Sequence, residues 1–447
     1  MSGTRPLRYA LLLAPVATAG AGAVQAQEAD PFALRPPSPL LRDDVAGTRT
    51  FPGMAPAGRR AGPLRVFPAV SLRAGADSNV LGRTADRRGD AAITLAPALA
   101  ATGTSGKAEY GLTAAAALTR YASLTDQNSE TWDLGARITT PLAGRLTLAA
   151  GGGWSRRLEP NDTAAAAAVD GSATLYRQLG GDLALRAALG PLRITGSLAL
   201  ARSTYLPVTR ADGTAIDQSF RDQRTVTAGF RLEHALPGGR VIFAQANLRR
   251  ADSLDPLACC DRSSNGGEAL GGITTSLGSL FNAEVAVGIR WRTYDAPAFR
   301  SYSGLAWRAR LEWYPTPLVS VALTGQRDIV DSGIPTAAGT VVDRAEVKMF
   351  YEFRRNLDFV LTASATREKV RDRAPVSPPA PIGPPAPGFA PNPGAHSESV
   401  GAEARYALSN RYLVGAFTRF RNRSADNALL PRQGRAVEAG LSLRLSL

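Results

Sequence analysis

The chain has 447 residues, a formal net charge of +14 and 44% hydrophobic residues, with a mean hydropathy of −0.10. That hydropathy is too low for a bundle of transmembrane helices, because each such helix needs about 20 consecutive apolar residues. A basic chain often binds nucleic acid, but there is no lysine-rich run or nucleic-acid motif, so we expect no such partner. The arginines instead recur at alternate positions within strand-like segments.

The N-terminus predicts export. Arg5 and Arg8 precede a short apolar segment, and small residues follow it as far as Ala26. This pattern is typical of a secretory signal peptide over residues 1–26, cleaved after Ala26. A membrane anchor is the alternative, but Pro15 interrupts the short apolar segment. Residues 27–63 are polar and proline-rich, which predicts an extended periplasmic segment.

From residue 64 onward, apolar residues recur at every second position, which is the period of a β-strand. The clearest example is the C-terminal strand, where Val437, Leu441 and Leu445 alternate with polar or small residues. The same parity in the segments around residues 281–291 and 305–313 predicts these lipid-facing side chains: Phe281, Val285, Val287, Trp291, Trp307, Leu311 and Trp313.

Three features favour a membrane barrel over a soluble β-sandwich. No segment supplies a helix to cover either face of the sheet, so the sheet must close on itself. The connections alternate between short and long, as they do in outer-membrane barrels. Aromatic residues lie near strand ends, where interfacial girdles are expected: Trp132, Trp154, Trp291, Trp313 and Tyr314. The prediction is therefore an all-β protein, a closed antiparallel transmembrane up-and-down β-barrel spanning residues 64–447.

The connections set the number of strands. Eight short turns and nine long loops connect 18 strands, an even number as in bacterial barrels. The number becomes 16 if Gly180-Gly181 forms a hairpin turn or if the strand at 412–422 fails. The longest loop, residues 369–397, is rich in proline and cannot join a sheet ladder, so we expect it on the extracellular side.

Charged residues occupy the polar parity of the same strands. With the loop after residue 292 centred near residue 299, Arg290 would lie opposite Arg308, and Glu268 would fall near Arg290. Either a ladder of salt bridges or a basic track that attracts anions explains this cluster. The predicted charged residues of the lumen wall are Arg290, Arg292, Arg308, Arg310, Glu268, Glu284, Glu312, Arg344, Glu346 and Lys348.

Catalytic and metal chemistry finds little support in the sequence. The two histidines, His234 at a strand end and His396 in the proline-rich loop, are not placed to activate a serine. There is no phosphate-binding loop, no dinucleotide motif and no metal-ligand spacing, so we expect no cofactor and no metal. Cys259 and Cys260 are interpreted as loop cysteines, with a strained vicinal disulfide as the alternative.

Several segments also resemble a known family. They include Gly75-Ala-Asp-Ser-Asn79, Glu284-Val-Ala-Val-Gly288, Trp313-Tyr-Pro-Thr-Pro317 and Ser409-Asn-Arg-Tyr-Leu413. These segments resemble the outer-membrane β-barrel porins that are often encoded beside exopolysaccharide genes. The resemblance runs from about residue 64 to residue 447 and implies a link to exopolysaccharide export.

Two functions remain open at this point. The first is a porin-like channel or conduit in the outer membrane for small or anionic solutes or for a polysaccharide. The second is a non-conducting structural or adhesive barrel that binds a partner through its loops or N-terminal segment. Either barrel would contact outer-membrane lipid and reach the barrel-assembly machinery through its C-terminal strand.

Overall fold

The protein is described from a computed structural model, which covers residue 46 and residues 56–84, 86–159, 171–210, 212–255, 261–278, 280–333, 337–371, 394–425 and 434–446. The predicted signal peptide, the proline-rich part of the longest loop and the two cysteines lie outside these residues. The strands of the wall are β2 (Leu64–Asp77), β3 (Asp90–Ser105), β4 (Ala108–Tyr121), β5 (Ser129–Ala143), β6 (Leu146–Leu158), β7 (Leu175–Leu189), β8 (Leu192–Tyr205), β11 (Gln223–Leu236), β12 (Arg240–Ser253), β13 (Ser264–Leu277), β14 (Phe281–Tyr294), β15 (Tyr302–Thr316), β16 (Val319–Val330), β17 (Gly339–Arg354), β18 (Leu357–Arg371), β19 (Gly394–Ala407), β20 (Tyr412–Ala425) and β21 (Gly434–Ser446).

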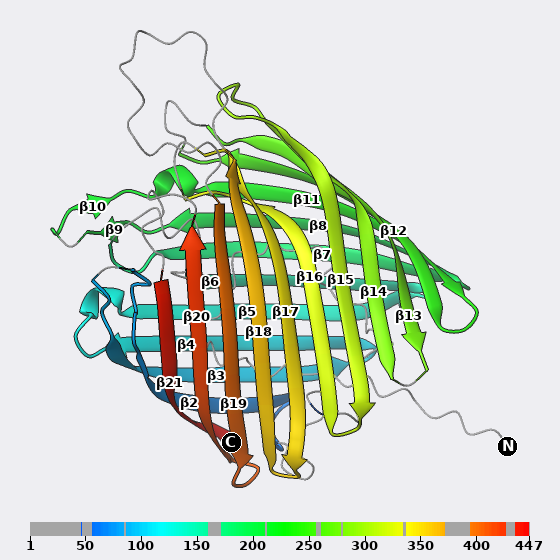
Figure 1. Ribbon diagram of the computed structural model, residues 1–447. Coiled ribbons are helices and arrows are strands. Elements are labelled where there is room, and N and C mark those ends of the chain that lie inside the picture. The colour runs from blue at the N-terminus through cyan, green and yellow to red at the C-terminus, as the bar shows by residue number, and fades with distance from the viewer. Residues whose placement is uncertain are drawn as a thin grey trace.

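These strands form one closed barrel (Figure 1). Each strand pairs antiparallel with the next along the chain, and β21 pairs with β2, so the sheet has no free edge. The wall therefore has the predicted 18 strands. Both doubtful segments are single strands, because β7 runs through Gly180-Gly181 and β20 runs without a break to Ala425. Closure satisfies the backbone hydrogen bonds that lipid cannot.

Short turns connect the strands at one end of the barrel, and long loops connect them at the other. Gly106 and Gly190 occupy turns with φ of 58° and 66°, a left-handed conformation that glycine adopts without steric cost. The long loops carry the remaining short elements: η1 (Thr125–Gln127), β9 (Val208–Thr209), β10 (Ala215–Ile216) and η2 (Ser219–Arg221). By the usual topology of such barrels, the loop end faces outward.

Two boundaries differ from the sequence prediction. The last residues of the predicted periplasmic segment form β1 (Arg59–Ala61), which pairs with the start of β2. Strands β18 and β19 extend into the predicted proline-rich loop, to Arg371 and from Gly394. His396 consequently lies in β19 and contacts Glu398, instead of lying in the loop. Hydrogen bonding to a neighbouring strand extends a strand past the point where its apolar alternation fades.

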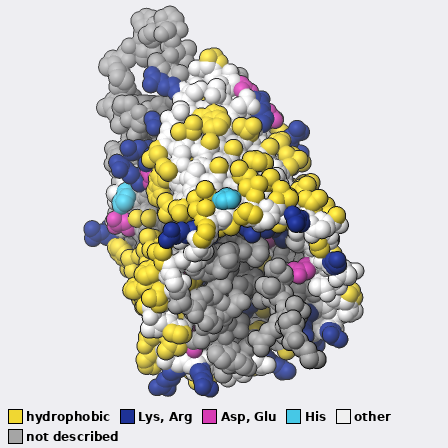
Figure 2. All heavy atoms as spheres, turned by 90° about the vertical axis from the view of Figure 1, so that its right-hand side faces the viewer, with side chains coloured by type: hydrophobic (Ala, Val, Ile, Leu, Met, Phe, Trp, Pro, Cys, Tyr) yellow, Lys and Arg dark blue, Asp and Glu magenta, His cyan; other side chains and the backbone are white. Residues whose placement is uncertain are grey.

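One face of the sheet is apolar and exposed around the barrel. Figure 2 shows hydrophobic side chains spread over the wall on the face turned to the viewer. Val285 and Val287 are 50% and 56% exposed, and Trp313 is 41% exposed. Leu311 is exposed on the same face, whereas Phe281, Trp291 and Trp307 are half-buried between their neighbours. Among the described residues, no helix is long and apolar enough to cross a membrane.

Tyr314 does not belong to the aromatic girdle. Its side chain is buried on the other face of the wall, where the hydroxyl donates a hydrogen bond to Glu312 at 2.7 Å. The girdle prediction used nearness to the strand end alone, but alternation sends Trp313 and Tyr314 to opposite faces. Trp132 and Trp154 do lie together, with ring centroids 4.3 Å apart.

Candidate functional site

The polar face of the wall is the inner face. Arg231 on β11 contacts Glu284 on β14 at 3.4 Å, although β12 and β13 lie between these strands. Side chains from strands so far apart converge only on the concave side of a curved sheet. Glu268, Arg290, Arg308 and Glu312 share this face, because register pairs and contacts connect them to one another.

The register of β14 and β15 corrects the predicted arrangement of arginines. Arg290 is paired with Gly304, and Arg308 is paired with Ala286, so the two guanidiniums are not opposite each other. The last register pair before the loop is Arg292 with Tyr302, so the hairpin is centred on residue 297. The sequence prediction had placed this centre near residue 299. A shift of the centre by two residues keeps every side chain on its face but changes its partner. Like charges directly opposite would have destabilised the strand pair.

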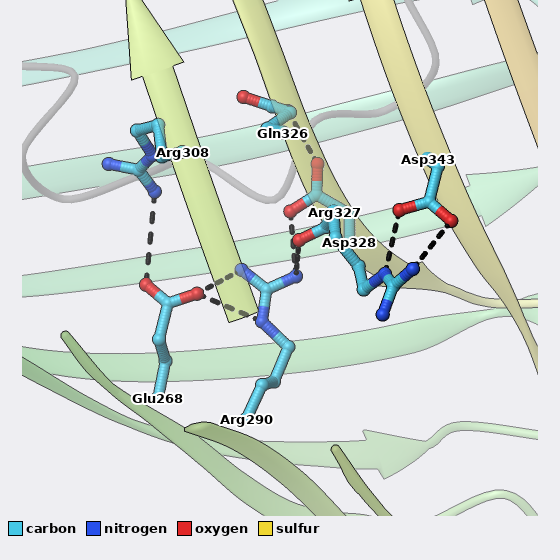
Figure 3. Close-up of polar contacts among 7 residues, drawn as sticks. All are labelled: Glu268, Arg290, Arg308, Gln326, Arg327, Asp328 and Asp343. Carbon is cyan, nitrogen blue, oxygen red and sulfur yellow. Dashed lines mark hydrogen bonds and ion pairs between the residues drawn. The ribbon is translucent and has the colours of Figure 1, made fainter. Parts of the chain in front are cut away.

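Arg290 is compensated by carboxylates on both sides instead of lying opposite a second arginine. Glu268 on β13 is the register partner of Arg290 and accepts a hydrogen bond from its Nε at 2.9 Å. Figure 3 shows Arg290 lying between Glu268 and Asp328, with Arg308 approaching the other oxygen of Glu268 at 3.8 Å. Arg327 and Asp343 form a separate bidentate pair in the same view. The prediction that Glu268 falls near Arg290 agrees with this geometry.

The other predicted wall residues are also in contact with neighbours. Arg310 donates from Nε to Glu312 at 2.8 Å and is paired in register with Glu284. Lys348 lies 5.0 Å from the ring of Phe350. Arg344 and Glu346 line a cavity of about 500 Å³ on the inner face of β16–β20 and β2, together with a row of hydroxyl side chains that includes Thr362, Ser364, Thr366, Ser397 and Ser399.

Exposure within the ion pairs of the inner wall is unequal. In four pairs the side chain of the arginine is more exposed than that of its carboxylate partner by at least 20 percentage points. Its side chain is 44% exposed against 9% for the Arg193–Glu233 pair, and 35% against 8% for the Arg310–Glu312 pair. The same holds for Arg308–Glu268 and Arg137–Asp182. The order is reversed in Arg231–Glu284, Arg157–Asp133, Arg290–Asp328 and the two pairs that Asp331 forms with Arg292 and Arg249.

A second cluster, at the mouth of the barrel on the loop end, was not predicted from the sequence. We call it the mouth cluster: Asp331, Gln223, Arg249 and Arg292. Asp331, just after β16, contacts Arg292 at 2.6 Å and Arg249 at 3.8 Å, and accepts a hydrogen bond from Gln223 at 2.7 Å. Burial alone would raise the pKa of Asp331, but the guanidiniums of Arg292 and Arg249 hold it well below its usual range.

The described ends of the β16–β17 loop are packed inside the mouth. Ser332 is fully buried, and the hydroxyl of Tyr294 donates a hydrogen bond to the carbonyl of Ala338 at 2.6 Å. Ala337 packs against Val370 and Ala395 on the opposite side. The described end of this loop therefore contacts β14 on one side and β18 and β19 on the other. The sequence predicts a loop near residues 329–340 but not its contacts, because its partners are distant in the chain.

The described residues contain no group of three or more His, Cys, Asp or Glu side chains that could hold a metal ion. The site is instead a set of ion pairs on the inner wall.

Comparison with known proteins identifies the family. A model of the family described as "putative beta-barrel porin 2" matches residues 51–443. The chain belongs to this family. Its family and its closed barrel place this porin-type protein in the outer membrane. A search of curated proteins finds no match.

Solved structures with similarity include OccK2 of Pseudomonas aeruginosa, at 14% identity over 86% of this chain and 96% of that chain, with a TM-score of 0.44. OccK3 of the same organism has 15% identity over 86% and 95%, with a TM-score of 0.41. The siderophore receptor PirA of Acinetobacter baumannii has 8% identity over 87% and 81%, with a TM-score of 0.44.

Proposed function

We propose that this porin-family barrel is a passive conduit for small hydrophilic solutes and that it favours anions. One observation supports the preference for anions. In four ion pairs of the inner wall the carboxylate is the more buried partner, so the groups that a solute meets there are mainly guanidiniums. A low-dielectric wall focuses such a field and attracts anions.

The test is the reversal potential of the purified protein in planar bilayers under a salt gradient. Arg308→Gln combined with Arg310→Gln should reduce the anion preference, because these side chains are partly exposed on the inner wall. Arg202→Gln combined with Arg224→Gln removes the same charge from the outer face and should leave selectivity unchanged. Salt screens charges beyond about 10 Å at 0.1 M, so the preference should weaken as salt rises. Cation preference in the wild type would contradict the proposal.

A second candidate function rests on the mouth cluster. The described loop end that packs at the mouth also fits a non-conducting barrel that presents its outer surface to a partner. Wild-type protein without conductance, together with Asp331→Asn protein without conductance, would favour this alternative. Conductance that appears only in Asp331→Asn would show a conduit held shut by the mouth cluster.

The remaining expectations belong to the same proposal. We propose that the chain is exported with a signal peptide cleaved after Ala26, and that its C-terminal strand is recognised by the barrel-assembly machinery. Transport, with no catalytic step, is the role that we assign to the inner wall. A polysaccharide as the transported solute rests on the family resemblance, and N-terminal sequencing of the mature protein tests the cleavage site.

A further inference from the structure

Four arginines gather on the outer face of the wall, at the loop end of neighbouring strands β6, β7, β8 and β11. We call Arg156, Arg177, Arg202 and Arg224 the arginine patch. Arg156 is the register partner of Arg177, and Arg202 is the register partner of Arg224. Leu179, two residues along from Arg177, is paired with Arg202, so the two arginine pairs adjoin.

The arginine patch lies next to the band of exposed apolar side chains that we call the apolar belt, on the loop-end side of that band. Each arginine follows the parity of exposed apolar residues on its own strand: Trp154, Leu179 and Leu200 are 48%, 58% and 52% exposed. Trp132 is the register partner of Arg156 and packs edge-on against Trp154. Tryptophans of this kind mark the level at which hydrocarbon gives way to lipid headgroups. The arginines therefore lie at the height of the headgroups.

The described residues place one carboxylate beside the patch: Asp252 is the register partner of Arg224 but forms its ion pair with Arg250. Like charges directly opposite each other destabilise a strand pair, yet no described carboxylate forms an ion pair with any of the four arginines. Asp222 interacts electrostatically with Arg202, but its carboxylate accepts the backbone N–H of Tyr205 at 2.7 Å. The next outward arginine along the rim, Arg250, is neutralised by Asp252 and Asp295, both at 2.7 Å.

We infer that the arginine patch is a binding site for the phosphate groups of an anionic lipid headgroup in the outward-facing leaflet. Guanidiniums bind phosphate oxygens in a planar, two-pronged geometry that lysine lacks. The exposed belt beneath the patch would receive the acyl chains of the same lipid. A lipid therefore fits both halves of this surface, whereas a soluble anion fits only the arginines. This site is separate from the proposed solute path, because it lies on the opposite face of the wall.

The experiment measures how much lipid A, a phosphorylated glycolipid, stays bound to the purified full chain in a neutral detergent, by native mass spectrometry. The patch variant carries Arg156→Gln, Arg177→Gln, Arg202→Gln and Arg224→Gln. The matched control carries Lys107→Gln, Arg145→Gln, Arg355→Gln and Arg411→Gln, which removes the same charge from exposed turns at the other end of the barrel. Each basic residue near an anionic surface contributes about a fivefold affinity factor, so retention in the patch variant should fall at least about fivefold.

The control should retain lipid A as the wild type does, and inorganic phosphate should not displace it at millimolar concentration. Equal retention by the patch variant and the wild type would overturn the inference, as would an equal loss in the control, which would indicate unspecific charge attraction. Displacement by inorganic phosphate alone would show a site for small anions instead of a lipid headgroup. Heat-modifiable migration in gels checks that both variants are folded barrels.

Discussion

Strands β3 to β8 present mainly alanine, glycine, serine and threonine to the inside of the barrel, whereas β11 to β17 present ion-paired arginines and carboxylates. The two regions share one backbone architecture and similar strand lengths. On the small-residue side, Arg137 on β5 reaches Asp182 on β7 at 3.6 Å by passing over Gly151 on β6. A Cβ at Gly151 would lie 3.1 Å from the Asp182 carboxylate.

On the charged side, the carboxylates of the ion pairs are buried. Glu268 is 5% exposed and serves both Arg290 and Arg308, while Glu312 is held by Arg310 and Tyr314. Phe243, Leu270, Ala286 and Ala306 pack together on the same inner face. The difference shows that side-chain size on the inner parity divides the wall: one side carries large, ion-paired side chains, and the other carries mainly small ones.

The largest expected effect is the loss of a buried carboxylate from the charged side. Glu268→Gln should destabilise the barrel by about 3–5 kcal/mol, because two arginines lose their shared partner. Asp182→Asn, on the small-residue side, should cost about 1 kcal/mol or less, since Arg137 is 48% exposed and remains hydrated. Urea unfolding in lipid vesicles measures both. Similar losses for the two variants would mean that the two sides do not differ in burial.

A smaller effect is expected from crowding the backbone. A Cβ at Gly288 on the charged side would collide with the carbonyl oxygen of Ala269, so Gly288→Ala should cost about 1–3 kcal/mol. A Cβ at Gly151 comes closest to the ends of two flexible side chains and meets the backbone only at 3.5 Å, so Gly151→Ala should cost less. Gly271 has open space around it, so Gly271→Ala is the control and should stay within about 0.5 kcal/mol of the wild type. A stable Gly288→Ala variant would show that these strands are less closely packed.

Single-channel conductance provides a further test of the difference between the small-residue side and the charged side. Ala115 lies on the inner face of β4, where it is paired with Asp133, and Ala116 lies on the outer face, where it is paired with Trp132. If solutes pass along the small-residue side, Ala115→Trp should lower single-channel conductance, because the indole occupies that space. Ala116→Trp adds the same bulk toward lipid and should leave conductance unchanged. Equal conductance in both variants would move the solute path elsewhere.

The smallest effect concerns pH and the mouth cluster. The pKa of Asp331 is lowered in the folded protein, so its ion pairs stabilise the mouth above the ordinary carboxylate pKa of about 4. That contribution is lost only as pH falls further, through the lowered pKa. Conductance should therefore stay constant between about pH 7 and pH 4, with Asp331→Asn as the control that lacks the titrating group. A change centred near pH 6 would assign the gating to another group.

The sequence by itself determined which residues share a face, how many strands there are and where the turns fall. Successive side chains of any extended strand point to opposite faces, which is a local property of the chain. The face of each residue can therefore be predicted without knowing which strand is its partner. For this reason Arg290, Arg308 and Arg310 could be assigned to one face, and the turn residues could set the count of 18 strands.

Only the tertiary structure decided which side chains meet. The alternation in β14 and β15 is compatible with several registers that differ by an even number of residues, and the loop between them does not select one. In the structure, β15 pairs with β14 in the register that puts Gly304 opposite Arg290, while Arg290 contacts Glu268 on β13 and Asp328 on β16. The mouth cluster is the extreme case. Asp331 and Gln223 are 108 residues apart in the chain and become neighbours only because the wall from β11 to β16 curves.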